Sequence, residues 1–367
     1  MREYIDGATA IVRGALDAGC TFFAGYPITP ASGILMQMMR ELPRTGGVAV
    51  QGEDEIASIG MCIGATLGGA RAMTATSGPG ISLYSENLGL AVMGEVPLVV
   101  VDVQRLGPST GAATTVSQGD VQFVRWGTAG GYPIIALAPS NLVEAYRLTV
   151  KAFDLAERFR CPVFVLTDKE LVMSTTTVDT SAFGGVAARA RSALGSGEPY
   201  AYEPPDAVFP LHEFGRGGVV RFTGSTHDER AIITKDTATI ERLNRHLIAK
   251  IDDHREEIEM VDEDLEGGAS TLVLGYGIVG GVVRAAVADA RARGMSVSGV
   301  VVQSLWPVPE TALARAMAGA DRVVVAELNH GLYRREIERI AGGREVVGVE
   351  RIDGDLIAPE QIVEVIR

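Results

Sequence analysis

The most constraining feature of this sequence is a regular alternation of short apolar runs with segments of helical periodicity. Short runs rich in valine are typical of strands that are buried on both faces of a parallel sheet. The run at 97–103 (PLVVVDV) is the clearest, and the segment 142–159 shows the spacing of an amphipathic helix. The alternation therefore predicts a parallel α/β sheet in the first half of the chain.

The same pattern gives an expected order of elements. Proline after Thr29 suits the first position of a helix, so we expect a helix from Pro30 with Thr29 as its N-cap. Strands are expected at 21–24, 48–50, 71–76, 97–103, 134–137 and 163–166, and further helices at 4–16, 54–67, 81–93 and 142–159.

The chain changes character near residue 175. From there to about residue 264 it is rich in Gly, Pro, Thr and charge and ends in a polar helix expected at 237–260. A second α/β unit begins near residue 270. We therefore expect a first domain at 1–178, a connecting segment at 179–267 and a second domain at 268–367.

Charge and cysteine content exclude several classes of function. The 46 acidic and 33 basic side chains give a formal charge of −13, and no run of Lys and Arg could neutralise phosphates, so we expect no nucleic-acid partner. No apolar run is long enough to span a membrane, and the first residues lack a signal peptide. Three scattered cysteines indicate buried thiols in a reducing cytoplasm and no metal site.

Ligands of open parallel sheets bind beyond the carboxyl ends of the strands, so residues that follow each predicted strand are the candidates for a site. Thr29 follows the first strand, where a helix start would offer free N–H groups to a carboxylate; a capped turn is the alternative. Arg105 follows the strand 97–103 and suits a bidentate contact with a carboxylate, while a surface salt bridge is the ordinary alternative.

Two further candidates lie between these. Glu55 begins the helix expected at 54–67, where packing against small residues would partly desolvate a carboxyl group and suit it to proton exchange. The alternative, that acids in a first turn complement the helix dipole, accounts for its two acidic neighbours. The loop 76–80 (TSGPG) is similar to a backbone nest, but it lacks the lysine of a P-loop.

Several motifs carry a resemblance to a known family. YPITP, EDEIASI, TATSGPG and DVQRLGPSTG occur in the order and approximate spacing of the α subunits of 2-oxoacid:ferredoxin oxidoreductases. RWGTAG, LGYG, LWPVPE and AELNHG continue it over nearly all the chain except parts of 180–265. The resemblance implies an α/β fold: a thiamine diphosphate pyrimidine-binding domain, followed by a domain like the C-terminal domain of transketolase.

The resemblance also implies roles for residues. Glu55 matches the glutamate that hydrogen-bonds N1′ of the aminopyrimidine and promotes deprotonation of the thiazolium. Thr29 and Arg105 match residues that hold the 2-oxo-carboxylate of the substrate. The pyrimidine side of the cofactor would be bordered by Tyr26, Pro27, Ile28, Ser77, Gly78, Pro79 and Asn87.

The implied reaction is the CoA-dependent oxidative decarboxylation of a 2-oxoacid to acyl-CoA and CO₂, in either direction, with ferredoxin as electron carrier. This chain lacks a GDG…N motif for diphosphate and Mg²⁺, and its cysteines could not hold a [4Fe–4S] cluster. The resemblance therefore implies a partner β subunit that carries the diphosphate, Mg²⁺ and cluster, and a γ subunit or domain commonly accompanies it.

The substrate expectation favours 2-oxoglutarate, with branched-chain and other 2-oxoacids as alternatives. Two departures weaken it: the stretch 112–118 has no lysine where a PTKxxQ pattern is expected, and Ala129 stands where a histidine is expected. Two other functions stay open. The chain could belong to a non-oxidative thiamine diphosphate-dependent 2-oxoacid decarboxylase, or it could be a non-catalytic scaffold subunit that keeps the fold.

Overall fold

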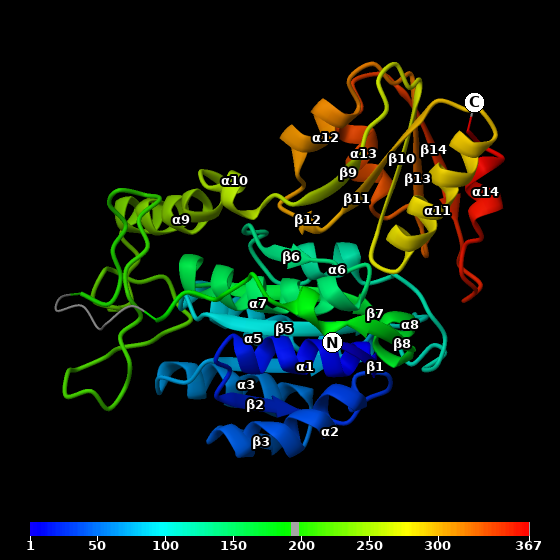
Figure 1. The fold of residues 1–367 in the computed structure, drawn as a ribbon. Helices are drawn as coiled ribbons and strands as arrows, with labels where there is room; N and C mark the ends of the chain where they lie inside the picture. The colour runs from blue at the N-terminus through cyan, green and yellow to red at the C-terminus, as the bar shows by residue number, and fades with distance from the viewer. Residues whose placement is uncertain (192–197, 367) are drawn as a thin grey trace.

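A computed structural model describes residues 1–191 and 198–366 of the chain (Figure 1). It contains a seven-stranded sheet, a five-stranded sheet and a two-stranded ribbon. The two large sheets lie in separate layers, and the long helix of the connecting segment lies to one side of both (Figure 1). The predicted α/β fold class is confirmed.

The first sheet has the strand order β12-β6-β7-β5-β4-β2-β3, and all pairs except β12 with β6 are parallel. Its central strands are fully buried, as their valine-rich sequences predict. The strands are β2 (Phe22–Gly25), β3 (Val48–Gln51), β4 (Ala72–Thr76), β5 (Leu98–Gln104), β6 (Ile135–Leu137), β7 (Pro162–Asp168) and β12 (Ser304–Trp306).

Helices cover both faces of this sheet. One core cluster joins α1, α2 and α7 to it, and another joins α3 and α5 to its opposite face. The helices of this layer are α1 (Gly7–Asp17), α2 (Ser32–Glu41), α3 (Glu55–Leu67), α4 (Pro79–Leu83), α5 (Ser85–Met93), α6 (Val121–Trp126), α7 (Leu142–Phe159) and α8 (Lys169–Met173), with short 3₁₀ turns η1 (Leu42–Thr45) and η2 (Thr180–Phe183).

The first residues differ from the expected helix at 4–16. They form β1 (Arg2–Asp6), which pairs antiparallel with β8 (Thr175–Asp179), and the helix begins only at Gly7. The Asp6 carboxylate accepts a hydrogen bond from the Thr9 amide at 2.8 Å and so caps this helix. Pairing with a distant segment outweighs the local helical spacing of the apolar residues.

The second domain has a five-stranded sheet of order β14-β13-β10-β11-β9, in which only β9 is antiparallel. Its strands are β9 (Val261–Asp264), β10 (Thr271–Tyr276), β11 (Val297–Val302), β13 (Arg322–Glu327) and β14 (Glu345–Glu350). Its helices are α11 (Val279–Ala292), α12 (Glu310–Ala316), α13 (Arg334–Ile340) and α14 (Pro359–Val363).

The strand β12 belongs to the second half of the chain but extends the first sheet. Ser304 pairs with Leu137, and the Ala138 amide donates to the Gln303 carbonyl at 2.7 Å. The buried Trp306 indole donates to the Val121 carbonyl at 3.0 Å. These contacts join the two domains through backbone hydrogen bonds as well as side chains.

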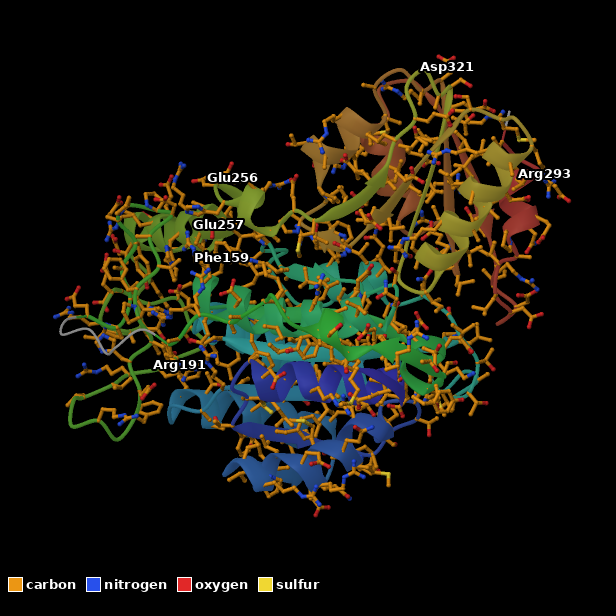
Figure 2. All side chains as sticks on the ribbon, in the orientation of Figure 1. Phe159, Arg191, Glu256, Glu257, Arg293 and Asp321 are labelled. Atoms are coloured by element: carbon orange, nitrogen blue, oxygen red, sulfur yellow. The ribbon has the colours of Figure 1, made fainter. Side chains whose placement is uncertain are left out.

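The connecting segment contains α9 (Thr237–Asp252) and α10 (Arg255–Ile258), so the polar helix expected at 237–260 is interrupted near His254. In Figure 2, Glu257 of α10 lies just above Phe159 at the end of α7. Arg158 donates to Glu257 at 2.9 Å at this junction. No helix in the described part of the chain is long and apolar enough to cross a membrane.

A buried charge cluster attaches α9 to the first domain. Glu95, in the turn before β5, accepts from His246 at 2.8 Å and from Lys250 at 3.0 Å. All three side chains are about 2% exposed. Buried charges persist where opposite charges and hydrogen bonds compensate for the lost hydration, as they do here.

Candidate active site at the ends of β2, β4 and β5

Glu55 is the first residue of α3 and is only 6% exposed. Asp54 caps this helix by accepting from the Ala57 amide at 2.7 Å, which leaves Glu55 free of a capping role. The structure gives the Glu55 carboxylate no hydrogen-bond partner among the described residues. A buried carboxylate without a partner is costly, so this group is suited to a ligand that donates to it.

Gly80 opens space beside Glu55. A Cβ atom at Gly80 would lie 2.8 Å from Glu55 Oε1 and 2.0 Å from Thr76 Oγ1, so only glycine fits there. The hydroxyls of Thr76 and Ser77 are buried and have no hydrogen-bond partner. The Glu55 carboxylate and the unpartnered Thr76 hydroxyl thus lie beside one small region at the end of β4, which suits the polar edge of a ring such as an aminopyrimidine.

The predicted helix start at Thr29 and Pro30 is wrong. The Ser32 amide donates to the Ile28 carbonyl at 2.9 Å, and this turn delays the helix, so α2 begins at Ser32 after Ala31. Thr29 therefore does not cap a helix. Because α2 begins three residues later, the free N–H groups of its first turn do not lie at the Thr29 side chain, contrary to the expectation from the sequence. Instead, the Thr29 carbonyl accepts a hydrogen bond of 2.5 Å from Arg105 Nη1.

Arg105 lies directly after β5 and is only 6% exposed. Its Nε is buried without a partner, and a Cβ atom at Gly78 would lie 3.5 Å from the Arg105 side chain. Gly78 has φ +45°, a conformation that favours glycine. The structure thus brings Arg105, Thr29 and the 76–80 loop together, as the carboxyl-end argument predicts.

A cavity of about 530 Å³ lies beside Arg105. Gly78, Pro79 and Arg105 line it from the first domain, and Asn329 and His330 line it from the second. This volume is within the range of small-molecule sites. Both domains therefore contribute to the space next to the predicted carboxylate-binding arginine.

The remaining predicted cofactor residues, Tyr26, Pro27, Ile28 and Asn87, are less buried than Glu55 and Arg105. Tyr26 is 37% exposed, Pro27 is exposed and Ile28 packs partly against the first core. Asn87 is on α5 and donates to the Ile56 carbonyl of α3 at 3.3 Å. None of these four lines the cavity beside Arg105. They lie outside it, and Asn87 contacts the first turn of α3.

Sequence reasoning missed Asp102 and Asp120, a carboxyl pair next to Arg105. Asp102 is fully buried in β5, and neither of its oxygens has a donor; one oxygen of Asp120 also lacks a partner. Burial and the Asp120 charge raise the pKa of Asp102 well above its usual value, and burial raises the pKa of Asp120 to about 6. A single acid within the apolar run VVVDV was the available signal.

The pair predicts a stabilising substitution, Asp102→Asn. Because both pKa values exceed the ordinary 3.8, the folded state binds more protons than the unfolded chain. The stability that these protons provide is lost as the pH rises from about 4 through the two folded-state pKa values, of which that of Asp120 is about 6. The side-chain amide of asparagine does not ionise, so the variant does not lose stability in this way. We expect the melting temperature to rise by about 2–4 °C at pH 8 and less at pH 5, measured by thermal unfolding. An equal shift at both pH values would mean that the raised pKa values are not the cause of the stabilisation.

Comparisons with known proteins agree with the geometry. The family model "Pyruvate flavodoxin/ferredoxin oxidoreductase, thiamine diP-bdg" matches residues 13–245, and "Pyruvate:ferredoxin oxidoreductase core domain II" matches 269–362. The chain is 41% identical to 2-oxoglutarate synthase subunit KorA of Methanocaldococcus jannaschii, over 98% of each protein. It is 36% identical to ketoisovalerate oxidoreductase subunit VorB of Methanothermobacter thermautotrophicus, over 100% of this chain and 97% of that protein.

A solved structure is also closely similar. It is the 2-oxoglutarate:ferredoxin oxidoreductase of Magnetococcus marinus with 2-oxoglutarate, coenzyme A and succinyl-CoA bound, with a TM-score of 0.92 and 32% identity. The match covers 99% of this chain and 64% of the solved chain, so the chain spans slightly less than two thirds of that protein.

These matches confirm the leading interpretation of the sequence, a subunit for CoA-dependent oxidative decarboxylation of a 2-oxoacid with ferredoxin. The domain boundaries after residues 178 and 267 stay predictions. The thiamine diphosphate-binding match and the second-domain match together account for most of the chain. The chain belongs to the 2-oxoacid:ferredoxin oxidoreductases, as their α-type subunit.

Proposed function

We propose that this chain supplies the pyrimidine half of a thiamine diphosphate site in an enzyme that acts on 2-oxoglutarate. The observation that carries the proposal is the buried, unpartnered Glu55 carboxylate beside Gly80. Thiamine diphosphate, when bound, supplies a carbon nucleophile for 2-oxoacids. Glu55 would accept a hydrogen bond from the pyrimidine and hold the proton that the cofactor exchanges, while Thr76 and Ser77 would orient the ring.

Arg105 would hold the 2-oxo-carboxylate, and Thr29 would position the Arg105 guanidinium group for it. The guanidinium group is largely shielded from water, which strengthens its attraction to an anion, and Nε has no competing partner in the protein. The Thr29 carbonyl fixes the guanidinium through Nη1. This arrangement leaves donors of Arg105 available for one carboxylate.

The choice of 2-oxoglutarate rests on the 2-oxoglutarate synthase relatives, which are more similar to this chain than the ketoisovalerate oxidoreductase relative. The cavity beside Arg105 supports it, because His330 provides a second nitrogen donor there for a distal carboxylate. Of the two departures from the family pattern, Ala129 does not line this cavity, whereas the stretch 112–118 reaches it through Ser117. Thr115 of the same stretch lies next to Gly354 of the second domain.

A partner β subunit would complete the site, with the diphosphate, Mg²⁺ and a [4Fe–4S] cluster; a γ subunit and ferredoxin would complete the enzyme. No group of three or more potential metal ligands occurs among the described residues. An exposed apolar face next to Glu55 suits such a partner: Ile56 is 50% exposed, Leu83 is 46% exposed, and a side chain at Gly60 or Gly64 would meet nothing.

One assay tests this function. The native complex should reduce viologen in the presence of CoA and 2-oxoglutarate, and it should contain iron and thiamine diphosphate. Pyruvate, 2-oxoisovalerate and phenylglyoxylate are the competing substrates. A higher kcat/KM for one of them would reject 2-oxoglutarate, and a complex without iron would reject the redox reaction itself.

Arg105→Ala should raise the KM for the 2-oxoacid by about 10- to 100-fold, because one charge-assisted carboxylate contact is lost. The KM for CoA should stay within twofold of the wild-type value. Steady-state viologen reduction measures both constants. Arg40→Ala is the control, since that side chain is 62% exposed on α2. An increase confined to the KM for CoA would contradict the proposed role.

A further inference from the structure

Gln118 lies near the end of the loop 106–120, which follows Arg105, and it joins this loop to the second domain. Its side chain is 1% exposed; Nε2 donates to the Tyr276 carbonyl at 2.9 Å, and Oε1 accepts from the Leu328 amide at 3.0 Å. Its backbone is held as well, because its amide donates to the Leu328 carbonyl at 2.9 Å and its carbonyl accepts from Asn329 Nδ2 at 2.8 Å.

The partners of Gln118 are themselves fixed within the second domain. Asn329 Nδ2 also donates to the Tyr276 hydroxyl at 2.9 Å, and that hydroxyl donates to Glu327 at 2.9 Å. The side chains of Tyr276 and Glu327 are fully buried, and Asn329 is 4% exposed. Gln118 therefore joins a hydrogen-bond network that is built from the LGYG and AELNHG segments. The members of this network are buried and hold one another in place, so the network is rigid.

The loop leads from this contact back to Arg105. Two residues after Gln118, the Asp120 amide donates to the Gln104 side chain at 3.0 Å, and Gln104 precedes Arg105 in the chain. Asp120 lines the same cavity as Arg105. The loop 106–120 is thus anchored at both ends, and the second domain and Gln104 both hold its far end.

We propose that Gln118 is a positioning residue through which the second domain fixes Arg105 for the 2-oxoacid. Nothing in the arrangement places Gln118 on the substrate; it acts by holding the loop whose start carries Arg105. The inference rests on the proposed role of Arg105 in carboxylate binding. Small displacements of such a group cost much binding, because its hydrogen bonds depend on geometry.

The test compares Gln118→Ala with Gln122→Ala in the complete complex. Gln122 is a matched control: it has the same side chain, lies four residues further on, and also contacts the second domain, donating to the Leu332 carbonyl at 2.9 Å. We expect Gln118→Ala to raise the KM for the 2-oxoacid about five- to fiftyfold, with kcat and the KM for CoA within twofold. Gln122→Ala should leave all three constants near the wild-type values.

A second measurement does not depend on activity. Hydrogen exchange of the assembled complex should speed up in 106–120 for Gln118→Ala and not for Gln122→Ala, and Asn329→Ala should reproduce the effect. Equal KM values or equal exchange for the two glutamine variants would overturn the proposal. If the wild-type complex does not oxidise 2-oxoacids, the proposed function fails, but altered exchange would still show that Gln118 holds the loop.

Discussion

Glu55→Gln should lower the turnover of the assembled enzyme by about a hundred- to ten-thousandfold while leaving its fold unchanged. The amide has the same size, so the packing of Glu55 against Gly80 is kept. The substitution removes the buried Glu55 carboxylate, which can accept a proton and return it, whereas the glutamine amide cannot. Viologen reduction at saturating CoA and 2-oxoacid measures the turnover, and gel filtration with thermal unfolding checks assembly and folding.

Glu53→Gln is the matched control for this prediction. Glu53 lies two residues earlier, is exposed and carries the same charge, so its substitution changes the local field near the start of α3 without touching the buried group. We expect its turnover to stay within about twofold of the wild-type value. Near-normal turnover of Glu55→Gln would mean that the proton-exchanging group has been misassigned.

Glu95→Ala should destabilise the protein by about 3–5 kcal/mol, since it leaves Lys250 and His246 buried without their shared carboxylate. These residues attach α9 to the turn before β5, so the connecting segment should become the first part of the chain to be cleaved by protease. Urea unfolding measures the free energy, and mass spectrometry of the fragments locates the cleavage.

The effect should depend on pH. Burial alone would raise the pKa of Glu95, but Lys250, His246 and Arg160 outweigh it and hold the pKa well below the usual value. A lowered pKa adds stability above about pH 4.5 that is lost as the pH falls, so the difference between wild-type and variant should shrink in acid. Glu241→Ala, which breaks an exposed ion pair on α9, should cost less than about 1 kcal/mol. An equal cost would contradict the argument.

Much of the fold could be predicted because it depends on local patterns. The bounds expected for α7 agree with the structure, since its apolar face and the Asn141 cap are both encoded within the segment itself. The carboxyl ends of parallel strands share one edge, so Arg105 could be placed near Thr29 and the 76–80 loop from sequence order. The contact between Arg105 and Thr29 follows that expectation, although it uses a backbone carbonyl.

The features that sequence reasoning missed all depend on distant partners. β1 forms because residues 175–179 lie beside it, and β12 because β6 has a free side. The start of α2 is set by a turn at Ile28, which a favourable proline position does not reveal. The role of Gln118 arises only when residues 276 and 328 approach it, more than a hundred positions further along the chain.

The position of β12 has a consequence for how the chain can be divided. An outer strand of a sheet presents unpaired N–H and C=O groups that can recruit strands of other molecules. β12 pairs with the otherwise free edge of β6. A chain cut at residue 267 would lose β12 and expose the unpaired backbone groups of β6 to other molecules. The place where the sequence suggests a separation is therefore not a place where the protein can be separated without inviting aggregation.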